Sequence, residues 1–290
     1  YINIDAGTMN PTEHGEVYVT DDGDECDQDM GNYERFLGIT LSRDNYMTTG
    51  RVYQSVIEKE RNLEYGGKCV EVVPHVPLEI IERIKKAQKN AKADVVIIEI
   101  GGTVGEYQNI LFLEAARMMK IKHPGDVLFV MVSYLPVPSK VGEMKTKPTQ
   151  YAVRTLNASG IQPDIIVARA EKPLDEKRKQ KLAMFCNVPA NHIVSAPDIE
   201  SIYDVPVNFE KEKLSELICE FLGATCKPQN KKSAGEWKKF VSRVHHSKDT
   251  VNIAMVGKYF ETGDYVLSDS YLSVIEAIKY SAYSQRPSNP

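Results

Sequence analysis

The sequence predicts an α/β fold in which a parallel β-sheet is flanked by helices. Short runs rich in Val and Ile recur along the chain. Near-continuous runs of this kind are typical of strands that are buried on both faces. Amphipathic helical patterns lie between the runs, and strands that alternate with helices in this way indicate parallel pairing through right-handed crossovers.

Six apolar runs with many β-branched residues are expected to be strands. They are residues 68–75 (KCVEVVPH), 94–102 (DVVIIEIGG), 126–135 (DVLFVMVSYL), 164–170 (DIIVARA), 192–196 (HIVSA) and 251–258 (VNIAMVGK). The helical patterns between them place apolar residues on one face, at the spacing of an α-helix. The helices are expected at residues 77–93, 108–122, 149–159 and 176–185.

The composition changes after Phe221, and this change predicts the domain boundaries. Residues 224–250 are rich in lysine and poor in large apolar groups, which indicates a linker with one short helix at 234–244. We therefore expect a first domain at residues 1–223 and the start of a second α/β domain at residues 251–290. The chain begins without Met on a strand-like stretch, so both ends are expected to be cuts through a larger protein.

Charge and cysteine content exclude several classes of protein. The formal net charge of the 290 residues is -4, so no general attraction to nucleic acid or to acidic membrane is expected. The five cysteines are odd in number and include no C-x-x-C pair, which favours reduced thiols in the cytoplasm over a disulfide or zinc framework. No apolar run approaches the ~20 residues that span a membrane.

Two acidic positions are candidates for binding Mg²⁺. Glu99 ends an apolar run and is followed by Gly101 and Gly102, an arrangement that suits a metal and phosphate site at the end of a strand. Asp29 is the last acidic residue of a run that starts at Asp21 and is expected to be the most shielded of that run. The alternatives are a helix-initiating turn with a capping acid at Glu99 and a solvated acidic loop at Asp21–Asp29.

The segment KTKPTQ is a candidate phosphate clamp. It contains Lys145, Lys147 and two threonines, and Pro148 is suited to the first turn of a helix. The free N–H groups of that turn, two cations and two hydroxyls could together hold a triphosphate. The alternative is an ordinary loop before a helix. The chain has no G-x-x-x-x-G-K-[ST] loop, which such a phosphate site would otherwise suggest.

Several stretches together resemble the CTP synthase family. They are DAGTMNPTEHGEVYVTDDG, GNYERFL, TTGRVYQSVIEKER, EIGGTVGE, KTKPTQ, SGIQPDIIVARA, LAMFCNV and MVGKY followed by SYLSVIEAIKY. The resemblance extends from Tyr1 to about Ala282. It implies a P-loop NTPase-like amidoligase domain at residues 1–223 that lacks its N-terminal phosphate-binding loop. It also implies that residues 251–290 open a glutaminase domain of which most is absent.

The resemblance implies a reaction and a set of ligands. The family aminates UTP to CTP with ATP, Mg²⁺ and ammonia from glutamine, through UTP phosphorylated on O4, and this is the last step of new CTP synthesis. The expected assembly is a homo-oligomer, generally a tetramer, in the cytoplasm. The glutaminase residues lie beyond Pro290, so no catalytic residue is assigned in this chain, and the 290 residues alone are expected to be inactive.

The resemblance also assigns binding roles to matching positions. Asp29 and Glu99 would hold Mg²⁺ on the ATP phosphates, and Arg169, Asp198 and Ile199 would lie at the adenine. Lys181 and the residues of KTKPTQ would bind the triphosphate of UTP or CTP; the latter are Lys145, Thr146, Lys147, Pro148, Thr149 and Gln150. The cytosine base would be read by Glu106, Tyr107 and Gln108, where a carboxylate can accept a hydrogen bond from the 4-amino group. The family more often has Asp where this chain has Glu106.

Two other functions remain open at the level of the sequence. The chain could belong to a different amide-forming P-loop ligase that acts on a carboxylic acid, although KTKPTQ favours a triphosphate. It could also be a non-catalytic module that binds nucleotides or supports assembly. Competition between UTP and other acceptors would distinguish the first alternative, and CTP formation by the isolated chain would exclude the second.

Overall fold

The computed structural model describes residues 1–140, 142–225, 229–246, 250–260 and 268–284, and side chains in α10 from residue 233 onward. The chain forms two compact units, which are described separately. Unit 1 contains residues 1–99 and 246–290, and unit 2 contains residues 100–245. No helix in the described ranges is long and apolar enough to cross a bilayer.

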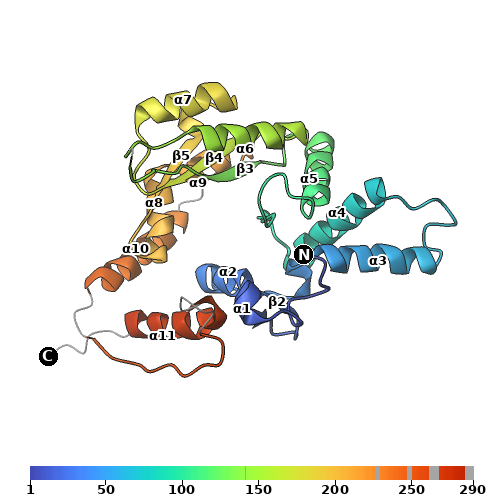
Figure 1. Ribbon diagram of the computed structural model, residues 1–290, viewed down its shortest axis with the longest axis horizontal. Coiled ribbons are helices and arrows are strands. Elements are labelled where there is room, and N and C mark those ends of the chain that lie inside the picture. Colours follow the sequence, from blue (N-terminus) through green and yellow to red (C-terminus); the bar gives the residue numbers. More distant parts are fainter. Residues whose placement is uncertain (141, 226–228, 247–249, 261–267, 285–290) are drawn as a thin grey trace. The chain divides into compact units, whose positions relative to one another are not determined.

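Unit 2 is built on a parallel sheet of order β3-β4-β5 (Figure 1). Its strands are β3 (Val130–Tyr134), β4 (Ile165–Ala170) and β5 (Ile193–Pro197). In the register, Val132 pairs with Val167 and Val167 pairs with Val194. The predicted parallel sheet flanked by helices is therefore confirmed.

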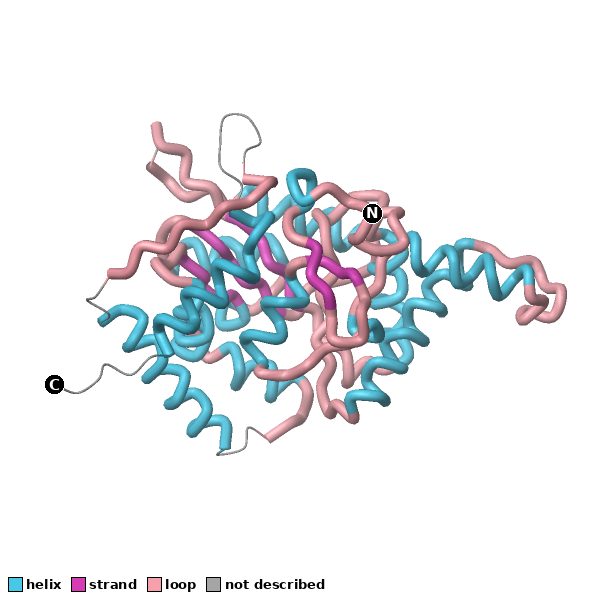
Figure 2. The backbone as a smooth tube through the Cα atoms, turned by 90° about the horizontal axis from the view of Figure 1, so that it is seen from below, coloured by secondary structure: helices cyan, strands magenta, loops and turns pink. Residues whose placement is uncertain are grey.

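Helices cover both faces of this sheet, and Figure 2 shows the strands in magenta among helices in cyan. On one face, β-strand residues such as Ile166 and Ala168 pack with residues of three helices, α5 (Ile110–Lys122), α6 (Lys147–Ala158) and α7 (Glu176–Cys186). The opposite face packs against α8 (Val205–Lys211) and α9 (Leu214–Phe221). The remaining elements of unit 2 are η2 (Ala190–His192), η3 (Ile202–Asp204) and α10 (Gln229–His246).

Unit 1 is mostly helical and contains one short antiparallel pair, β1 (Val17–Val19) with β2 (Glu25–Asp27). The long helices α3 (Thr49–Arg61) and α4 (Val72–Ala91) lie side by side and are joined by the loop at residues 62–71 (Figure 1). The other elements are α1 (Pro11–His14), α2 (Asp29–Leu37), η1 (Arg43–Asn45), η4 (Ser268–Tyr271) and α11 (Leu272–Ser284).

The N-terminal and C-terminal segments of unit 1 are joined by hydrogen bonds. The Glu16 backbone N–H donates to the Asp269 carbonyl at 2.9 Å, and the Ser273 N–H donates to Glu16 Oε2 at 2.9 Å. The Ser270 hydroxyl donates to the Pro11 carbonyl at 3.3 Å. The first turns of η4 and α11 are therefore anchored on the segment that leads into β1.

Three of the six strand predictions are wrong in this structure. Residues 68–75 are not a strand, since α4 starts at Val72 and the run contains Pro74, which cannot donate to a ladder. The run at 94–102 and the run at 251–258 form no ladder among the described residues. Ile97 is 88% exposed, so this apolar segment has composition typical of a strand but no neighbour to pair with. The predictions at 126–135, 164–170 and 192–196 are confirmed by β3, β4 and β5.

The helix predictions agree with the structure, with shifted ends. The regions at 77–93, 108–122, 149–159 and 176–185 correspond to α4, α5, α6 and α7, and the linker helix predicted at 234–244 is the longer α10. The expectation that all thiols are reduced is wrong at Cys219, which is disulfide-bonded, whereas Cys26, Cys69 and Cys186 are free. An odd count of cysteines leaves at least one thiol without a partner in the chain but does not exclude a bridge between others.

The core of unit 2 provides a stability test on α7. Leu182 is fully buried among the residues that cover the sheet, whereas Met184, two positions later, is 80% exposed. We expect Leu182→Ala to lower the free energy of unfolding by about 2–5 kcal/mol, because it leaves a cavity in a packed core. Met184→Ala should change it by less than about 0.5 kcal/mol. Urea unfolding followed by Trp237 fluorescence measures both, and equal effects would contradict the assignment of the core face.

Candidate functional site

Asp29 and Glu99 lie near each other in unit 1, although 70 positions separate them. Asp29 is the first residue of α2, directly after the β1–β2 pair, and Glu99 follows an apolar run. The pKa of Glu99 is raised, first by burial and then by the negative charges of Asp29 and Asp27. The Tyr33 hydroxyl, from the next turn of α2, donates a hydrogen bond to Glu99 Oε2.

Asp27 adds a third carboxylate to this region. Burial raises the pKa of Asp27, the neighbouring His14 lowers it and Asp29 raises it further. His14 Nδ1 lies 3.5 Å from Asp27 Oδ2. Negative charge thus accumulates here, and His14 is the side chain that the structure places beside Asp27.

The pair Asp29 and Glu99 fits a Mg²⁺ site completed by other ligands. Among the described residues there is no group of three or more His, Cys, Asp and Glu side chains placed to hold a metal. Mg²⁺, however, is commonly held by one or two carboxylates together with waters and substrate phosphates. The mutual repulsion that raises the pKa of Glu99 is the repulsion that a divalent cation would relieve.

Two other members of the acidic run, Asp24 and Asp22, have structural partners. Asp24 accepts two hydrogen bonds from the Arg51 guanidinium, at 2.8 and 3.0 Å. Asp22 accepts from the Thr20 hydroxyl at 2.5 Å and from the Arg43 backbone at 3.0 Å. The solvated-loop interpretation therefore does not describe these two residues, because their charges hold the loop in place.

The KTKPTQ segment leads into α6 at the carboxyl end of β3. Thr149 is completely buried, and its hydroxyl lies 2.8 Å from the Ser133 hydroxyl in β3. Thr146 is also buried and accepts from Gln150 Nε2 at 3.1 Å. The Thr149 hydroxyl thus fixes the first turn of α6 to the sheet, and the Thr146 hydroxyl is used within the start of α6 itself, while Lys147 is exposed.

Cations surround this first turn. Lys145 Nζ lies 2.7 Å from Glu143 Oε2. The pKa of Glu143 is lowered by its hydrogen bond to Lys145 and by the charges of Arg178 and Lys181. Lys181, on α7, is therefore close to the segment that the sequence grouped with it. Arg178 also pairs with Asp175, so Lys145 and Lys181 beside the one carboxylate of Glu143 leave positive charge available for an anionic ligand.

A pocket of ≈ 320 Å³ lies along the exposed side of α6. Its lining residues are Lys147, Gln150, Tyr151, Arg154, Asn157 and Phe185. The sequence reasoning missed Arg154. The signal for it was present, because positions seven apart on a helix share a face and Arg154 follows Lys147 by seven. The aromatic rings of Tyr151 and Phe185 are both exposed at this pocket.

The residues predicted to lie at adenine are together at the carboxyl ends of β4 and β5. Arg169 Nη2 lies 3.5 Å from Asp198 Oδ1, and both side chains are more than half exposed. The Asp198 N–H donates to the Ala170 carbonyl at 2.8 Å, and Ile199 follows at the surface. In parallel sheets ligands bind beyond this edge of the strands.

The predicted base-reading segment precedes α5. Glu106 accepts a hydrogen bond from the Thr103 backbone N–H at 3.0 Å, so its carboxylate closes a local turn. Tyr107 is 93% exposed and Gln108 is exposed. The Asn109 amide donates to the Thr103 carbonyl at 2.9 Å, and its Oδ1 is buried without a hydrogen-bond partner in the described structure.

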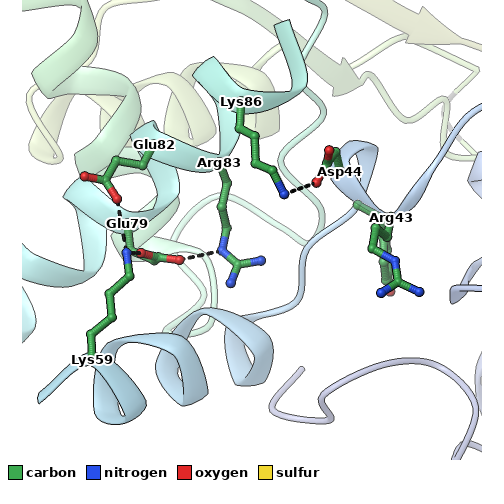
Figure 3. Close-up of a pocket in the computed structure, with 8 residues that line it drawn as sticks. Arg43, Asp44, Lys59, Glu79, Glu82, Arg83 and Lys86 are labelled. Carbon is green, nitrogen blue, oxygen red and sulfur yellow. Dashed lines mark hydrogen bonds and ion pairs between the residues drawn. The ribbon is translucent and has the colours of Figure 1, made fainter. Parts of the chain in front are cut away.

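A second pocket, of ≈ 210 Å³, lies in unit 1 between η1, α3 and α4 (Figure 3). Glu79 is its buried centre and accepts hydrogen bonds from Ser55, Lys59 and Arg83 at 2.8, 2.6 and 2.8 Å. Lys59 also pairs with Glu82, and Lys86 pairs with Asp44. Since carboxylates match nearly all of its cations, this pocket is a structural ion-pair network.

The comparisons with known proteins identify the family. The profile described as CTP synthase N-terminus matches residues 1–224. The chain belongs to this family. A CTP synthase from Thermococcus kodakarensis is 50% identical over 283 residues, which are 97% of this chain and 51% of that protein. The CTP synthase of Methanosarcina barkeri is 47% identical over 281 residues, 97% of this chain and 51% of the relative.

A bacterial relative gives the same result. The CTP synthase from Halalkalibacterium halodurans is 44% identical over 285 residues, 98% of this chain and 52% of that protein. The chain therefore spans about half the length of the curated relatives it matches. The resemblance to CTP synthase drawn from the sequence motifs is confirmed, as is the amidoligase-type α/β fold of the family's N-terminal part.

The ion-pair network of unit 1 predicts an acid-sensitive contribution to stability. Burial raises the pKa of Glu79, but hydrogen bonds from Lys59, Ser55 and Arg83 outweigh burial, and the net pKa is lowered. The stabilisation is therefore fully present above the pKa of an unfolded Glu, about 4.3, and is lost as the pH falls through the lower folded value. Glu79→Gln should cost about 1–3 kcal/mol at pH 7 and should flatten this acid dependence.

The matched control is Glu82→Gln, because Glu82 pairs with the same Lys59 but its side chain is 70% exposed. This variant should lose less than about 0.5 kcal/mol, as expected for an exposed ion pair. Thermal unfolding between pH 3 and pH 7 measures both variants. An acid dependence that survives in Glu79→Gln would assign it to other carboxylates.

Proposed function

We propose that this chain is the synthetase part of a CTP synthase that aminates UTP with ATP as co-substrate. The observation that carries the proposal is the first turn of α6, which the Ser133–Thr149 contact fixes at the carboxyl end of β3 with Lys145, Lys147 and Lys181 around it. Backbone N–H groups of a helix start and several lysines are suited to a triphosphate. Membership of the CTP synthase N-terminus family supports UTP and CTP as its ligands.

The proposed roles follow the position of each group. Lys145, Lys147 and Lys181 bind the triphosphate, together with Gln150 and the N–H groups of the first turn of α6. Thr146, Pro148 and Thr149 shape that turn, with the two threonine hydroxyls directed into the protein. Arg154 extends the positive face of α6, since it lines the same pocket as Lys147.

The base and the co-substrate are assigned to other segments. Glu106, Tyr107 and Gln108 would read the 4-position of the base, and Arg169, Asp198 and Ile199 would hold adenine. Asp29 and Glu99 would hold Mg²⁺, and a divalent cation there supplies positive charge against phosphate oxygens. The carboxylates place that charge, and Tyr33 orients Glu99 through its hydroxyl.

The proposed reaction balances as a transfer of oxygen from uracil to phosphate. O4 of UTP attacks the γ-phosphorus of ATP, the bond from that phosphorus to the ADP oxygen breaks, ADP leaves, and the N3 proton of the uracil ring is released. Ammonia then attacks C4, the C4–O4 bond breaks, and inorganic phosphate leaves while nitrogen loses a proton. The ammonia would come from glutamine hydrolysis outside residues 1–290. Positioning and charge neutralisation are the tasks of the protein in such a transfer.

Assembly as a tetramer and a cytoplasmic location are part of the proposal.

Nucleotide-dependent stabilisation tests the triphosphate site. With Mg²⁺ present, CTP and UTP should raise the melting temperature of the chain and UMP should not, because a ligand that binds only the folded form stabilises it. Lys147→Ala should weaken UTP binding by roughly ten- to hundredfold, the loss expected when a charged hydrogen bond of about 1.5–3 kcal/mol is removed. Lys122→Ala, at the end of α5, is the control and should bind as the native chain does. Equal stabilisation by UMP would contradict a triphosphate clamp.

The carboxylate pair gives a prediction that needs no catalysis. Without divalent cations, Glu99→Gln should raise the stability of unit 1 by roughly 0.5–1 kcal/mol, since it removes repulsion between partly exposed charges. The same variant should weaken Mn²⁺ binding about tenfold or more, because a carboxylate ligand is lost. Asp126→Asn is the control, since Asp126 is 83% exposed near the start of β3. Thermal unfolding and Mn²⁺ electron paramagnetic resonance measure the two effects. Destabilisation by Glu99→Gln in the metal-free protein would contradict the charge argument.

A further inference from the structure

Helix α10 lies beside α8 (Figure 1) and packs against Tyr203 of η3 through aromatic side chains. Phe240 and Val241 are buried, and the Phe240 ring makes an edge contact with Tyr203 at 5.2 Å between centroids. Trp237 packs on Phe240 at 5.5 Å and donates its indole N–H to the Tyr203 carbonyl at 2.9 Å. Trp237, Val241 and His245 are four residues apart in succession, so they lie along one side of the helix.

The last turn of α10 is held by a carboxylate contact. His245 Nε2 lies 2.9 Å from both carboxylate oxygens of Asp204, at the end of η3. His245 Nδ1 lies 3.8 Å from Glu200 Oε2. On the same side of the helix, Lys238 Nζ pairs with Glu210 Oε2 of α8 at 2.7 Å. Of the polar groups in these contacts, His245 is the one whose charge ordinarily changes near neutral pH.

The charges that face His245 favour its protonated form. They are Asp204 from η3 and Glu200 from the preceding loop, while Glu210 of α8 is paired with Lys238. On α10 itself, the Arg243 guanidinium lies over the Phe240 ring. The hydrogen bond to Asp204 and the charge of Asp204 raise the pKa of His245, desolvation opposes them in part, and Glu200 makes a smaller contribution that raises it.

The sign of the pH dependence follows from this direction. A histidine whose pKa is raised in the docked state contributes its full stabilisation below the pKa of the undocked histidine, ordinarily about 6.5. That contribution is lost as the pH rises through the higher docked value. Each unit that separates the two pKa values changes the equilibrium between docked and released helix about tenfold.

We propose that α10 is a pH-sensitive latch, in which protonated His245 fastens the last turn of the helix to Glu200 and Asp204 and loss of the proton releases it. The family profile ends at residue 224, so α10 lies between that region and the segment that starts at Val251. When docked, α10 fixes the point from which the chain leaves unit 2. Release begins at the C-terminal turn, which His245 holds, and extends along the same side of the helix to the contacts of Trp237.

The latch also acts on a segment with a proposed role. Glu200 directly follows Asp198 and Ile199, which are assigned to adenine, and this consequence rests on the proposed function. His245 is therefore a positioning residue for that loop. The latch itself does not depend on which nucleotide the loop holds, so a test without nucleotide separates the two proposals.

Trp237 is the single tryptophan of the chain and lies in the docked face, so its fluorescence reports on α10 directly. We expect acrylamide quenching of Trp237 to increase between pH 6 and pH 8.5, with a midpoint above the ordinary value for histidine. His245→Gln should remove this pH dependence, because the titrating group is gone. Asp204→Asn should move the midpoint down towards the ordinary value, because the main source of the raised pKa is lost.

His123→Gln is the matched control, since His123 caps α5 in the same unit and its side chain is 43% exposed. This variant should keep the pH response of the native chain. Far-UV circular dichroism at each pH establishes that the variants are folded. The proposal is overturned if quenching in the native chain is constant over this pH range, or if His245→Gln retains the transition.

Discussion

The burial of β4 on both faces is the constraint on which unit 2 depends. Ile165 and Ile166 point to opposite faces of the sheet, and neither is exposed to solvent. Such a strand needs a packed layer on each side, which α6 and α7 provide on one face and α8 and α9 provide on the other. The carboxyl ends of the strands are left between these layers. Arg169, Asp198 and the first turn of α6 therefore lie at the same edge of the sheet, because the chain leaves each parallel strand there.

Unbalanced charge distinguishes the candidate sites from the structural ion pairs. Around Glu79, four cationic side chains face three carboxylates, and the buried charge has partners at hydrogen-bond distance. Asp29 and Glu99 instead repel each other, and the start of α6 has several lysines around the single carboxylate of Glu143. A folded chain tolerates such imbalance at a cost in stability, and perturbed ionisation of this kind is enriched at functional sites. The two imbalances have opposite signs, as a metal and a polyanion require.

The parts of the fold that local pattern predicts are those whose packing partners lie nearby in the chain. The runs at 164–170 and 192–196 become strands because each finds a parallel neighbour, and α6 and α7 form where apolar residues recur at helical spacing. The run at 94–102 has the same composition, but a strand also needs a ladder partner, which the run itself does not specify. Prolines at positions 74 and 77 explain why residues 68–75 do not form a strand.

At the candidate sites, the sequence predicts which residues take part but not which side chains contact one another. The sequence identified Asp29, Glu99 and the lysines of KTKPTQ from charge and position, and the structure places Asp29 near Glu99 and Lys145 near Lys181. It did not show that Thr149 bonds to Ser133, because that contact depends on how α6 meets β3. Arg154 became visible only when the register of α6 and its pocket were known. The direction of a side chain depends on how helices and strands pack, whereas the residue type can be taken from the sequence.

The exposed run Val95–Ile98 has a consequence for how the chain behaves in concentrated solution. Four consecutive β-branched residues carry no charge, and all of them are exposed in this structure. Short segments of this composition self-associate into intermolecular β-structure when their backbone groups are unpaired. Asp94 and Glu99 flank the run, and their charges oppose such stacking. The raised pKa of Glu99 means that its opposition weakens on acidification. The same carboxylate that is a candidate metal ligand thus also acts as a gatekeeper against aggregation.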